Sequence, residues 1–263
     1  MTAYTPDEMM TVAAARRLVN GATCFVGIGL PSAACNLARL THAHDLVLIY
    51  ESGTIGTRPN VLPLSIGDGE LAETARAVIP LTEVFTHYLQ RGRMDVGFLS
   101  AAQIDRFGNL NSTVIGLYGA PSVRLPGAGG APEIATNVKD LLIVMKQTAR
   151  SFVPRLDFRT SVGWLDGGDS RARAGIAGNG PRVVITDLGE LTPAEGSREL
   201  TLSAIFQGVT VDAVRAACGW PLRVADSVTV IDPPSDEELR TLRALHERTR
   251  AAHAQRVRIV LPT

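Results

Sequence analysis

The chain has 263 residues, which is enough for one large α/β domain or two small ones. Hydrophobic residues make up 45% and charged residues 20%, which predicts a folded rather than a disordered protein. The 26 basic side chains balance 26 acidic ones, so no basic field favours nucleic acid or an anionic membrane as a partner. No apolar run reaches the roughly 20 residues of a membrane span, and the N-terminus lacks the pattern of a signal peptide.

Three cysteines, Cys24, Cys35 and Cys218, show no metal-ligand spacing. An odd number of cysteines without such spacing favours reduced thiols in a cytoplasmic protein, and we expect no metal site.

The N-terminal third predicts a strand–helix–strand unit. Thr5 and Glu8, with Pro6 between them, form a capping-box pattern that begins a helix ending near Gly21. Apolar residues 22–26 predict a buried strand, residues 31–40 a helix, and residues 46–50 a second strand. Such a unit favours two parallel strands with a right-handed crossover.

The alternation continues along the chain. We expect a turn at residues 105–109 with a hairpin or bent strand pair within 100–116, and an exposed loop over 165–181. A second capping box, Ser235 to Glu238, begins a helix to about residue 253, followed by a short strand or tail at 256–261. Further helices are expected near 69–78, 83–91 and 132–139, and strands near 95–99, 112–116, 141–145 and 182–186.

These elements predict the α/β class: an open, mainly parallel sheet flanked by helices, with some antiparallel additions. We expect a single domain over residues 1–263, with the helix at about 235–253 packed on it or on a partner.

Glu51 is the sharpest chemical signal. It follows the strand at 46–50 and precedes Ser52 and Gly53. Ligand crevices of open α/β sheets lie at the carboxyl ends of the strands, so this carboxylate is placed to meet a substrate. A glutamate that caps the next turn is the alternative.

Two glycine-rich loops are further candidates. Gly27 and Gly29 follow a strand and precede the helix at Pro31, but Ser32 stands where a dinucleotide fingerprint needs its third glycine. Gly127, Gly129 and Gly130 precede a helix, and their N–H groups could form an oxyanion hole. A tight turn and a surface loop, respectively, are the structural alternatives.

Taken together, these segments resemble family I coenzyme A transferases. Glu51 with the five residues after it resembles the family's active-site segment, and Gly27 to Pro31 resembles the loop of its second, or B-type, chain. Many members read Ser-Glu-Asn-Gly at this position. This chain has Tyr50-Glu51-Ser52-Gly53 instead, and in this it looks like the glutaconate-type branch of the family. The stretches 64–73, 103–111 and 125–130 follow in the family's order, and the resemblance extends over about residues 8–250.

The resemblance implies a NagB/RpiA/CoA transferase-like fold and a B subunit that works with an A subunit, in a heterotetramer of two A and two B chains. It implies CoA transfer from succinyl-CoA to 3-oxoadipate, in aromatic degradation, through a glutamyl-CoA thioester on Glu51. Coenzyme A thioesters would be substrates, with no permanently bound cofactor. Gly127, Gly129 and Gly130 would bind the acyl oxygen, and Gly27, Gly29, Ser52 and Gly53 would form the CoA or substrate loop.

Three alternatives stay open at this point. One is a CoA-thioester hydrolase of the same fold, against which the presence of Glu51 argues. A second is a transferase for another dicarboxylate such as glutaconate. The third is a noncatalytic sugar-phosphate or nucleotide sensor that uses the glycine loops alone. Arg58 and Arg124 are candidate partners for a distal substrate carboxylate.

Overall fold

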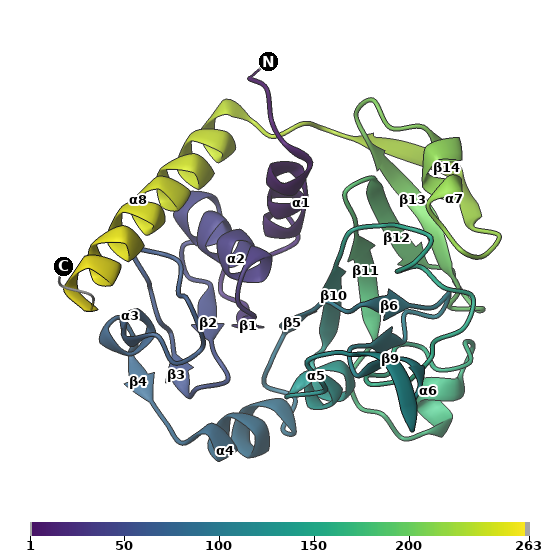
Figure 1. Cartoon of the computed structure of the whole chain (residues 1–263), viewed down its shortest axis with the longest axis horizontal. Coiled ribbons are helices and arrows are strands. Elements are labelled where there is room, and N and C mark those ends of the chain that lie inside the picture. Colours follow the sequence, from purple (N-terminus) through teal and green to yellow (C-terminus); the bar gives the residue numbers. More distant parts are fainter. Residues whose placement is uncertain (1, 261–263) are drawn as a thin grey trace. The chain divides into compact units, whose positions relative to one another are not determined.

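The structure is a computed structural model that describes residues 2–260. The chain forms two compact units (Figure 1). Unit 1 comprises the chain up to Val84 and from Pro234 onward, and unit 2 comprises the stretch between them, Phe85–Pro233. The single domain expected for residues 1–263 stays a prediction.

The strands of unit 1 are ordered β1-β2-β3-β4. β1 (Thr23–Phe25) and β2 (Val47–Ile49) are parallel and are connected by α2 (Leu30–Thr41), as the sequence pattern predicts. β3 (Thr54–Ile55) and β4 (Ala77–Val78) extend this sheet with antiparallel pairs. The parallel pair is buried as such strands usually are, with Cys24, Phe25, Leu48 and Ile49 at most 2% exposed.

Helices α1 (Pro6–Ala15), α2 and α8 (Asp236–Val260) pack against one another within unit 1. Their contact is apolar on α8, whose buried leucines recur at the helical spacing, and these are Leu239, Leu242 and Leu245. The core of unit 1 therefore depends on a helix contributed by the far end of the chain.

Both predicted capping boxes form, and each also joins α1 to α8. Glu8 accepts the Thr5 N–H at 2.8 Å and also receives Arg243 of α8 at 2.7 and 3.0 Å. Glu238 accepts the Ser235 N–H at 2.7 Å and receives Arg16 at 2.7 and 2.8 Å. Each glutamate therefore begins its own helix and binds an arginine from the other end of the chain.

Several elements of unit 1 differ from the sequence prediction. The helix expected over 69–78 is α3 (Gly69–Glu73), because Arg76 donates its N–H to Ile55 and the next residues join the sheet as β4. The expected strand or tail at 256–261 is helical as far as Val260, and Leu261 lies outside the described residues. The helix expected over 83–91 begins as α4 (Leu81–Glu83) and becomes π-helical at Val84–Leu89, where the chain enters unit 2.

The main strands of unit 2 are ordered β5-β10-β11-β12-β13-β14. β5 (Val96–Leu99), β10 (Asp140–Val144) and β11 (Pro181–Ile185) are parallel, and α5 (Ala131–Asn137) packs on β5. The sheet continues through antiparallel pairs to β12 (Gly189–Pro193) and β13 (Leu200–Phe206), and then parallel to β14 (Arg223–Ile231). The predicted mainly parallel sheet with antiparallel additions is confirmed.

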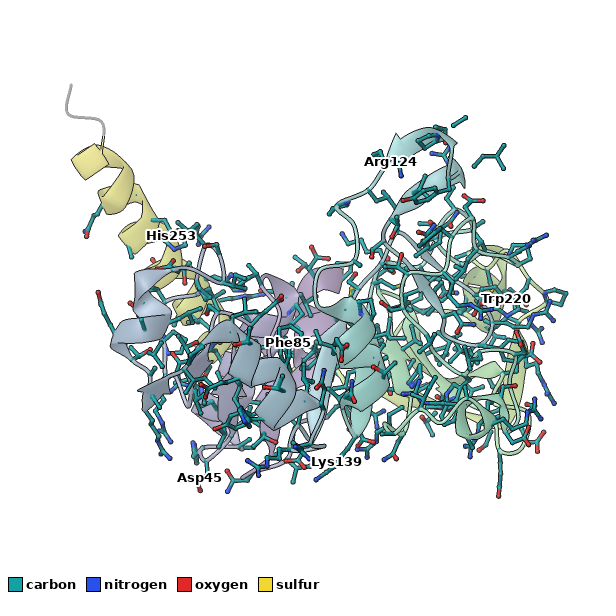
Figure 2. The ribbon with its side chains drawn as sticks, turned by 90° about the horizontal axis from the view of Figure 1, so that it is seen from below. Asp45, Phe85, Arg124, Lys139, Trp220 and His253 are labelled. Atoms are coloured by element: carbon teal, nitrogen blue, oxygen red, sulfur yellow. The ribbon has the colours of Figure 1, made fainter. Side chains whose placement is uncertain are left out.

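Two small hairpins complete unit 2. β6 (Gln103–Ile104) and β7 (Leu110–Asn111) flank the predicted turn, in which the Asp105 carboxylate accepts the N–H groups of Phe107 and Asn109. β8 (Val114–Leu117) and β9 (Ala120–Arg124) form the other hairpin, which carries Arg124 (Figure 2). The short helices α6 (Ser170–Arg173) and α7 (Val211–Ala216) connect strands.

The paired glutamates predict an acid-sensitive attachment of α8. The hydrogen bond from Arg243 lowers the pKa of Glu8, and although burial raises that of Glu238, the Arg16 hydrogen bond makes its net shift downward as well. Lowered carboxyl pKa values stabilise the fold above the ordinary carboxyl range, and this contribution is lost as pH falls through the lowered values. In the variant Glu8→Gln/Glu238→Gln, the free energy of unfolding should therefore fall less from about pH 5 to about pH 3 than in the wild type.

Urea unfolding followed by circular dichroism at each pH measures this difference. Glu237→Gln is the matched control, because Glu237 is an exposed glutamate in the first turn of α8. It should keep the wild-type pH dependence, and an unchanged dependence in the double variant would contradict the prediction.

Candidate active site

The parallel pairing of β1 and β2 brings two of the predicted loops to one edge of unit 1. Val26, which follows β1, donates its N–H to the carbonyl of Ile49 at 2.9 Å. Gly27 is the next residue after Val26, and Tyr50 and Glu51 follow Ile49. The Gly27–Gly29 loop and the Glu51 turn therefore lie at the carboxyl ends of adjacent strands, where α/β sheets bind ligands.

Glu51 sits in a tight turn between β2 and β3. Gly53 donates its N–H to the Tyr50 carbonyl at 3.0 Å, and Tyr50 donates to the Thr54 carbonyl at 3.1 Å, so Glu51 and Ser52 occupy the two central positions. The Glu51 side chain is half-buried and makes no hydrogen bond or ion pair with any residue that the structure describes. No contact in the described chain therefore holds this side chain as a cap of the turn.

Two buried hydroxyls beside Glu51 lack partners. Within residues 2–260, the Ser52 Oγ and the Thr54 Oγ1 are buried without any hydrogen bond. Leaving a buried polar group unpaired costs about 1–3 kcal/mol, and a bound molecule can remove that cost. Both groups lie within three residues of Glu51 in the same turn.

A buried hydrogen bond joins the two loops. The Tyr50 hydroxyl and the Ser32 hydroxyl are 2.8 Å apart, and both residues are at most 1% exposed. Burial raises the pKa of Tyr50 well above its usual value, which keeps the phenol neutral. Ser32 lies in the first turn of α2, so this bond holds the start of the helix against the residue before Glu51.

Sequence reasoning did not identify the pairing of Tyr50 with Ser32. The signals were present, namely a tyrosine ending an apolar strand and a serine in the first turn of the preceding helix, but no spacing rule connects them across the fold.

Gly53 and Gly29, both at this edge, are glycines for different structural reasons. Gly53 has φ +105°, and an added Cβ would lie 1.9 Å from the carbonyl oxygen of Ile79, so the backbone of its own unit occupies that space. Gly29 has φ +82° and begins α2 without a side-chain cap, and a Cβ there would meet nothing within 4 Å. The first turn of α2 begins at this edge, and first turns leave N–H groups without intrahelical partners.

The contrast between Gly53 and Gly27 predicts a difference in stability. Gly53→Ala should lower the free energy of unfolding by more than about 1 kcal/mol, because both its left-handed backbone and the Ile79 carbonyl oppose a Cβ. Gly27→Ala is the control, since its Cβ would meet only Pro31 ring carbons at 3.7 and 3.8 Å, and should change stability by no more than about 0.5 kcal/mol. Denaturant titration of both variants decides, and equal losses would show that crowding at Ile79 is not the cause.

The third predicted loop lies in unit 2. Gly127 has φ +104° and Gly129 φ +50°, and a Cβ on either would meet nothing within 4 Å. The Gly127 N–H already donates to the Ser112 carbonyl at 2.8 Å. In the described part of the chain, the N–H groups of Gly129 and Gly130 have no acceptor, so these two are the available donors of the predicted three.

The two candidate arginines make other contacts. Arg58 is exposed and donates to the His44 carbonyl at 3.1 Å, near the amino end of β2 and thus at the opposite end of that strand from Glu51. Arg124 lies over the Tyr118 ring at 4.9 Å and donates to the Tyr118 carbonyl, within its own hairpin. Neither contact brings a guanidinium to Glu51.

The remaining chemistry-bearing groups in the described chain include no candidate metal cluster. Among residues 2–260, no three His, Cys, Asp or Glu side chains gather in a way that could hold a metal ion. The Sγ atoms of Cys24 and Cys35 lie 3.6 Å apart as free thiols, and burial raises the pKa of Cys35. No helix in the described chain is long and apolar enough to cross a membrane.

Comparisons with known proteins show which families and relatives this chain resembles. The family model described as Coenzyme A transferase matches residues 7–217. The chain is 60% identical over 255 residues to the B subunit of 3-oxoadipate CoA-transferase from Pseudomonas knackmussii, covering 97% of this chain and 98% of the relative. It is also 28% identical over 217 residues to the IpdB chain of the cholesterol ring-cleaving hydrolase of Mycobacterium tuberculosis, covering 82% and 83% of the two chains.

A solved structure shows the same architecture. The crystal structure of glutaconate coenzyme A-transferase from Acidaminococcus fermentans matches with a TM-score of 0.87 and 32% identity. The match covers 92% of this chain and 94% of the other. The expected α/β fold is thus found in a solved relative over nearly its whole length.

Proposed function

Because the chain belongs to the coenzyme A transferase family, we propose that it is the B subunit of an enzyme that moves CoA from succinyl-CoA to 3-oxoadipate. The identity of 60% to the B subunit of a 3-oxoadipate CoA-transferase supports this choice of acceptor over glutaconate, since the B subunit of a glutaconate CoA-transferase is 35% identical.

The observation that carries the proposal is the unpaired Glu51 carboxylate at the carboxyl end of β2. A glutamate with no hydrogen-bond or ion-pair partner in the described chain has no structural task there, whereas a nucleophile must be free to attack. The unpaired hydroxyls of Ser52 and Thr54 beside it support the same use of the turn.

The reaction divides into steps that a carboxylate can perform. The Glu51 carboxylate attacks the thioester carbonyl of succinyl-CoA and expels CoA thiolate, which leaves a mixed anhydride. The thiolate then attacks the Glu51 carbonyl carbon of that anhydride, releasing succinate and forming a glutamyl-CoA thioester. The carboxylate of 3-oxoadipate attacks this thioester and expels CoA thiolate, which leaves a second mixed anhydride. The thiolate then attacks the 3-oxoadipyl carbonyl carbon of that anhydride, forming 3-oxoadipyl-CoA and releasing the Glu51 carboxylate. Covalent catalysis makes this exchange feasible because every intermediate remains activated.

Backbone N–H groups would stabilise the negative charge that develops on the reacting oxygen atoms. The available N–H groups of Gly129 and Gly130 are our choice for the developing oxyanion. The loop of Gly27 and Gly29, with the first turn of α2, would lie against the CoA or substrate, together with Ser52 and Gly53. Binding of the distant parts of CoA would help to assemble the transition state.

The proposal includes a partner. Relatives of this chain carry names that mark them as B subunits, and we propose an A subunit that completes the CoA site, in an assembly of two A and two B chains. The proposed compartment is the cytoplasm.

Variants of Glu51 test the nucleophile directly. Glu51→Ala should abolish transfer, Glu51→Gln should be comparably inactive, and Glu51→Asp should lose about 10²-fold because its carboxylate is withdrawn by one methylene. Glu73→Ala is the matched control, an exposed glutamate of unit 1, and should keep full activity. Transfer is measured with the co-purified A and B subunits, and mass spectrometry of the wild type with succinyl-CoA should show a CoA adduct on Glu51. Wild-type transfer by Glu51→Ala would refute the assignment.

Kinetics separate the transferase from its alternatives. Because the first acid leaves before the second reacts, initial rates against succinyl-CoA and 3-oxoadipate should give parallel double-reciprocal lines. This chain alone should show neither transfer nor adduct, and addition of the A subunit should restore both. CoA release from succinyl-CoA at the same rate with and without 3-oxoadipate would identify a hydrolase instead, and full activity of the isolated chain would contradict the proposed partner.

A further inference from the structure

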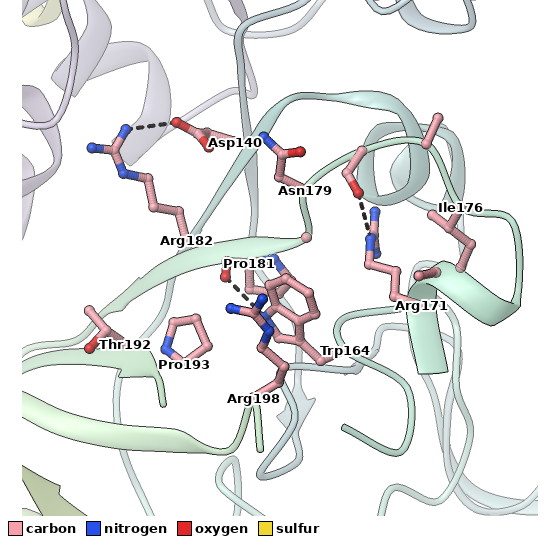
Figure 3. A pocket seen from close by; sticks show the side chains of 14 residues that line it. Asp140, Trp164, Arg171, Ile176, Asn179, Pro181, Arg182, Thr192, Pro193 and Arg198 are labelled. Carbon is pink, nitrogen blue, oxygen red and sulfur yellow. Dashed lines mark hydrogen bonds and ion pairs between the residues drawn. The ribbon is translucent and has the colours of Figure 1, made fainter. Parts of the chain in front are cut away.

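Unit 2 contains a cavity of about 570 Å³ that the proposed function does not use. It lies at the amino ends of β10 and β11, and its wall combines arginines with apolar surface (Figure 3). Its volume falls within the range of small-molecule sites, about 300–1,000 Å³. The residues that matter for its chemistry are Asp140, Trp164, Arg171, Arg182, Pro193 and Arg198.

Arg171 brings a buried positive charge to the wall. The sequence predicts an exposed loop over 165–181, but Arg171 is only 3% exposed. Its guanidinium donates to the carbonyls of Gly178, Gly163 and Ala135 at 2.6–2.8 Å, which explains why the loop folds inward around it. These acceptors are neutral, so no carboxylate cancels the charge.

Arg198 brings unpaired donors. Its guanidinium lies 4.5 Å from the centre of the Trp164 ring, and the indole N–H donates to the Pro181 carbonyl at 3.1 Å, which fixes the ring (Figure 3). The guanidinium finds no hydrogen-bond acceptor among the described residues. Stacking an arginine on a fixed aromatic face leaves the edge of its planar fork available for hydrogen bonds.

The backbone on both sides of this stack is unusual. Leu165, which follows Trp164, has φ +54°, and Arg198 has φ +62°. Within residues 2–260 these are the non-glycine residues with positive φ. Such conformations cost energy and gather at binding sites, and here one is Arg198 itself and the other is the residue after Trp164.

The balance of charge defines what the cavity could bind. Arg182 is paired with Asp140 at 2.7 Å, and among the lining residues, all in the described chain, Asp140 is the one acid against three arginines. The wall therefore keeps an excess of positive charge in a protein whose formal net charge is zero. The ring of Trp164 and the side chain of Pro193 supply apolar surface for a carbon skeleton.

We propose that this cavity is a binding site for a small organic molecule with at least two negative oxygens, carried by phosphoryl or carboxylate groups. Arg198 holds one anionic group through its free donors, and the field of Arg171 and Arg182 accommodates the second.

Titration calorimetry tests this with inorganic pyrophosphate and with malonate, in the absence of any CoA compound. The sample is the full chain with whatever partner chain co-purifies. We expect saturable binding that weakens as salt is raised. Arg198→Gln should weaken it about tenfold or more, because a charge-assisted bond is lost, and Arg182→Gln should weaken it in the same direction. Arg215→Gln is the matched control, an exposed arginine of α7 outside the cavity wall, and should bind as the wild type does.

The two probes distinguish the ligand's chemistry, since tighter pyrophosphate binding indicates a phosphoryl compound and tighter malonate binding a dicarboxylate. The absence of saturable binding by both probes would overturn the proposal. Binding that Arg198→Gln and Arg182→Gln leave unchanged would belong elsewhere on the protein and would overturn it as well. Because no CoA compound is present, these outcomes do not depend on whether Glu51 transfers CoA.

Discussion

The candidate active site depends on the parallel pairing of β1 with β2. This pairing places the residues after Phe25 beside the residues after Ile49, so one edge of unit 1 collects a helix start and a carboxylate. The Tyr50–Ser32 bond then fixes the two loops against each other in a place that water does not reach. Within a low-dielectric interior such a bond is strong, and losing one partner leaves a buried hydroxyl unpaired.

Both proposed sites contain polar groups without partners among the described residues. In unit 1 they are the Glu51 carboxylate and the hydroxyls of Ser52 and Thr54, and in unit 2 they are the N–H donors of Arg198. Such groups also occur outside the proposed sites, because the Gln147 Oε1, Trp220 Nε1 and His253 Nε2 atoms are buried without a hydrogen-bond partner in the described chain, whereas the buried Arg171 guanidinium meets three carbonyls. Most buried polar groups in proteins find partners, so the proposals for Glu51 and Arg198 rest on where these residues lie in the fold and not on missing partners alone.

Local signals in the sequence determined the helix starts, the first strand–helix–strand unit and the position of Glu51. Both capping boxes form, because their partners lie three residues apart and need no other part of the fold. The turn at Asp105 forms for the same reason. The strands β12, β13 and β14 were not predicted. Although β13 alternates buried and half-buried residues along its length, its sequence does not stand out from the neighbouring apolar runs.

The tertiary structure alone decided the contacts between residues that are far apart in the sequence. The sequence placed Gly53 beside Glu51, but only the fold shows that a Cβ at Gly53 would meet the Ile79 carbonyl. The sequence showed Glu8 and Glu238 as caps, and only the packing of α8 on α1 gave each an arginine from the other end of the chain. It marked 165–181 as an exposed loop, whereas three carbonyls draw Arg171 inside. Each of these outcomes depends on contacts that the fold creates between separate segments, and spacing along a sequence carries information only about neighbours.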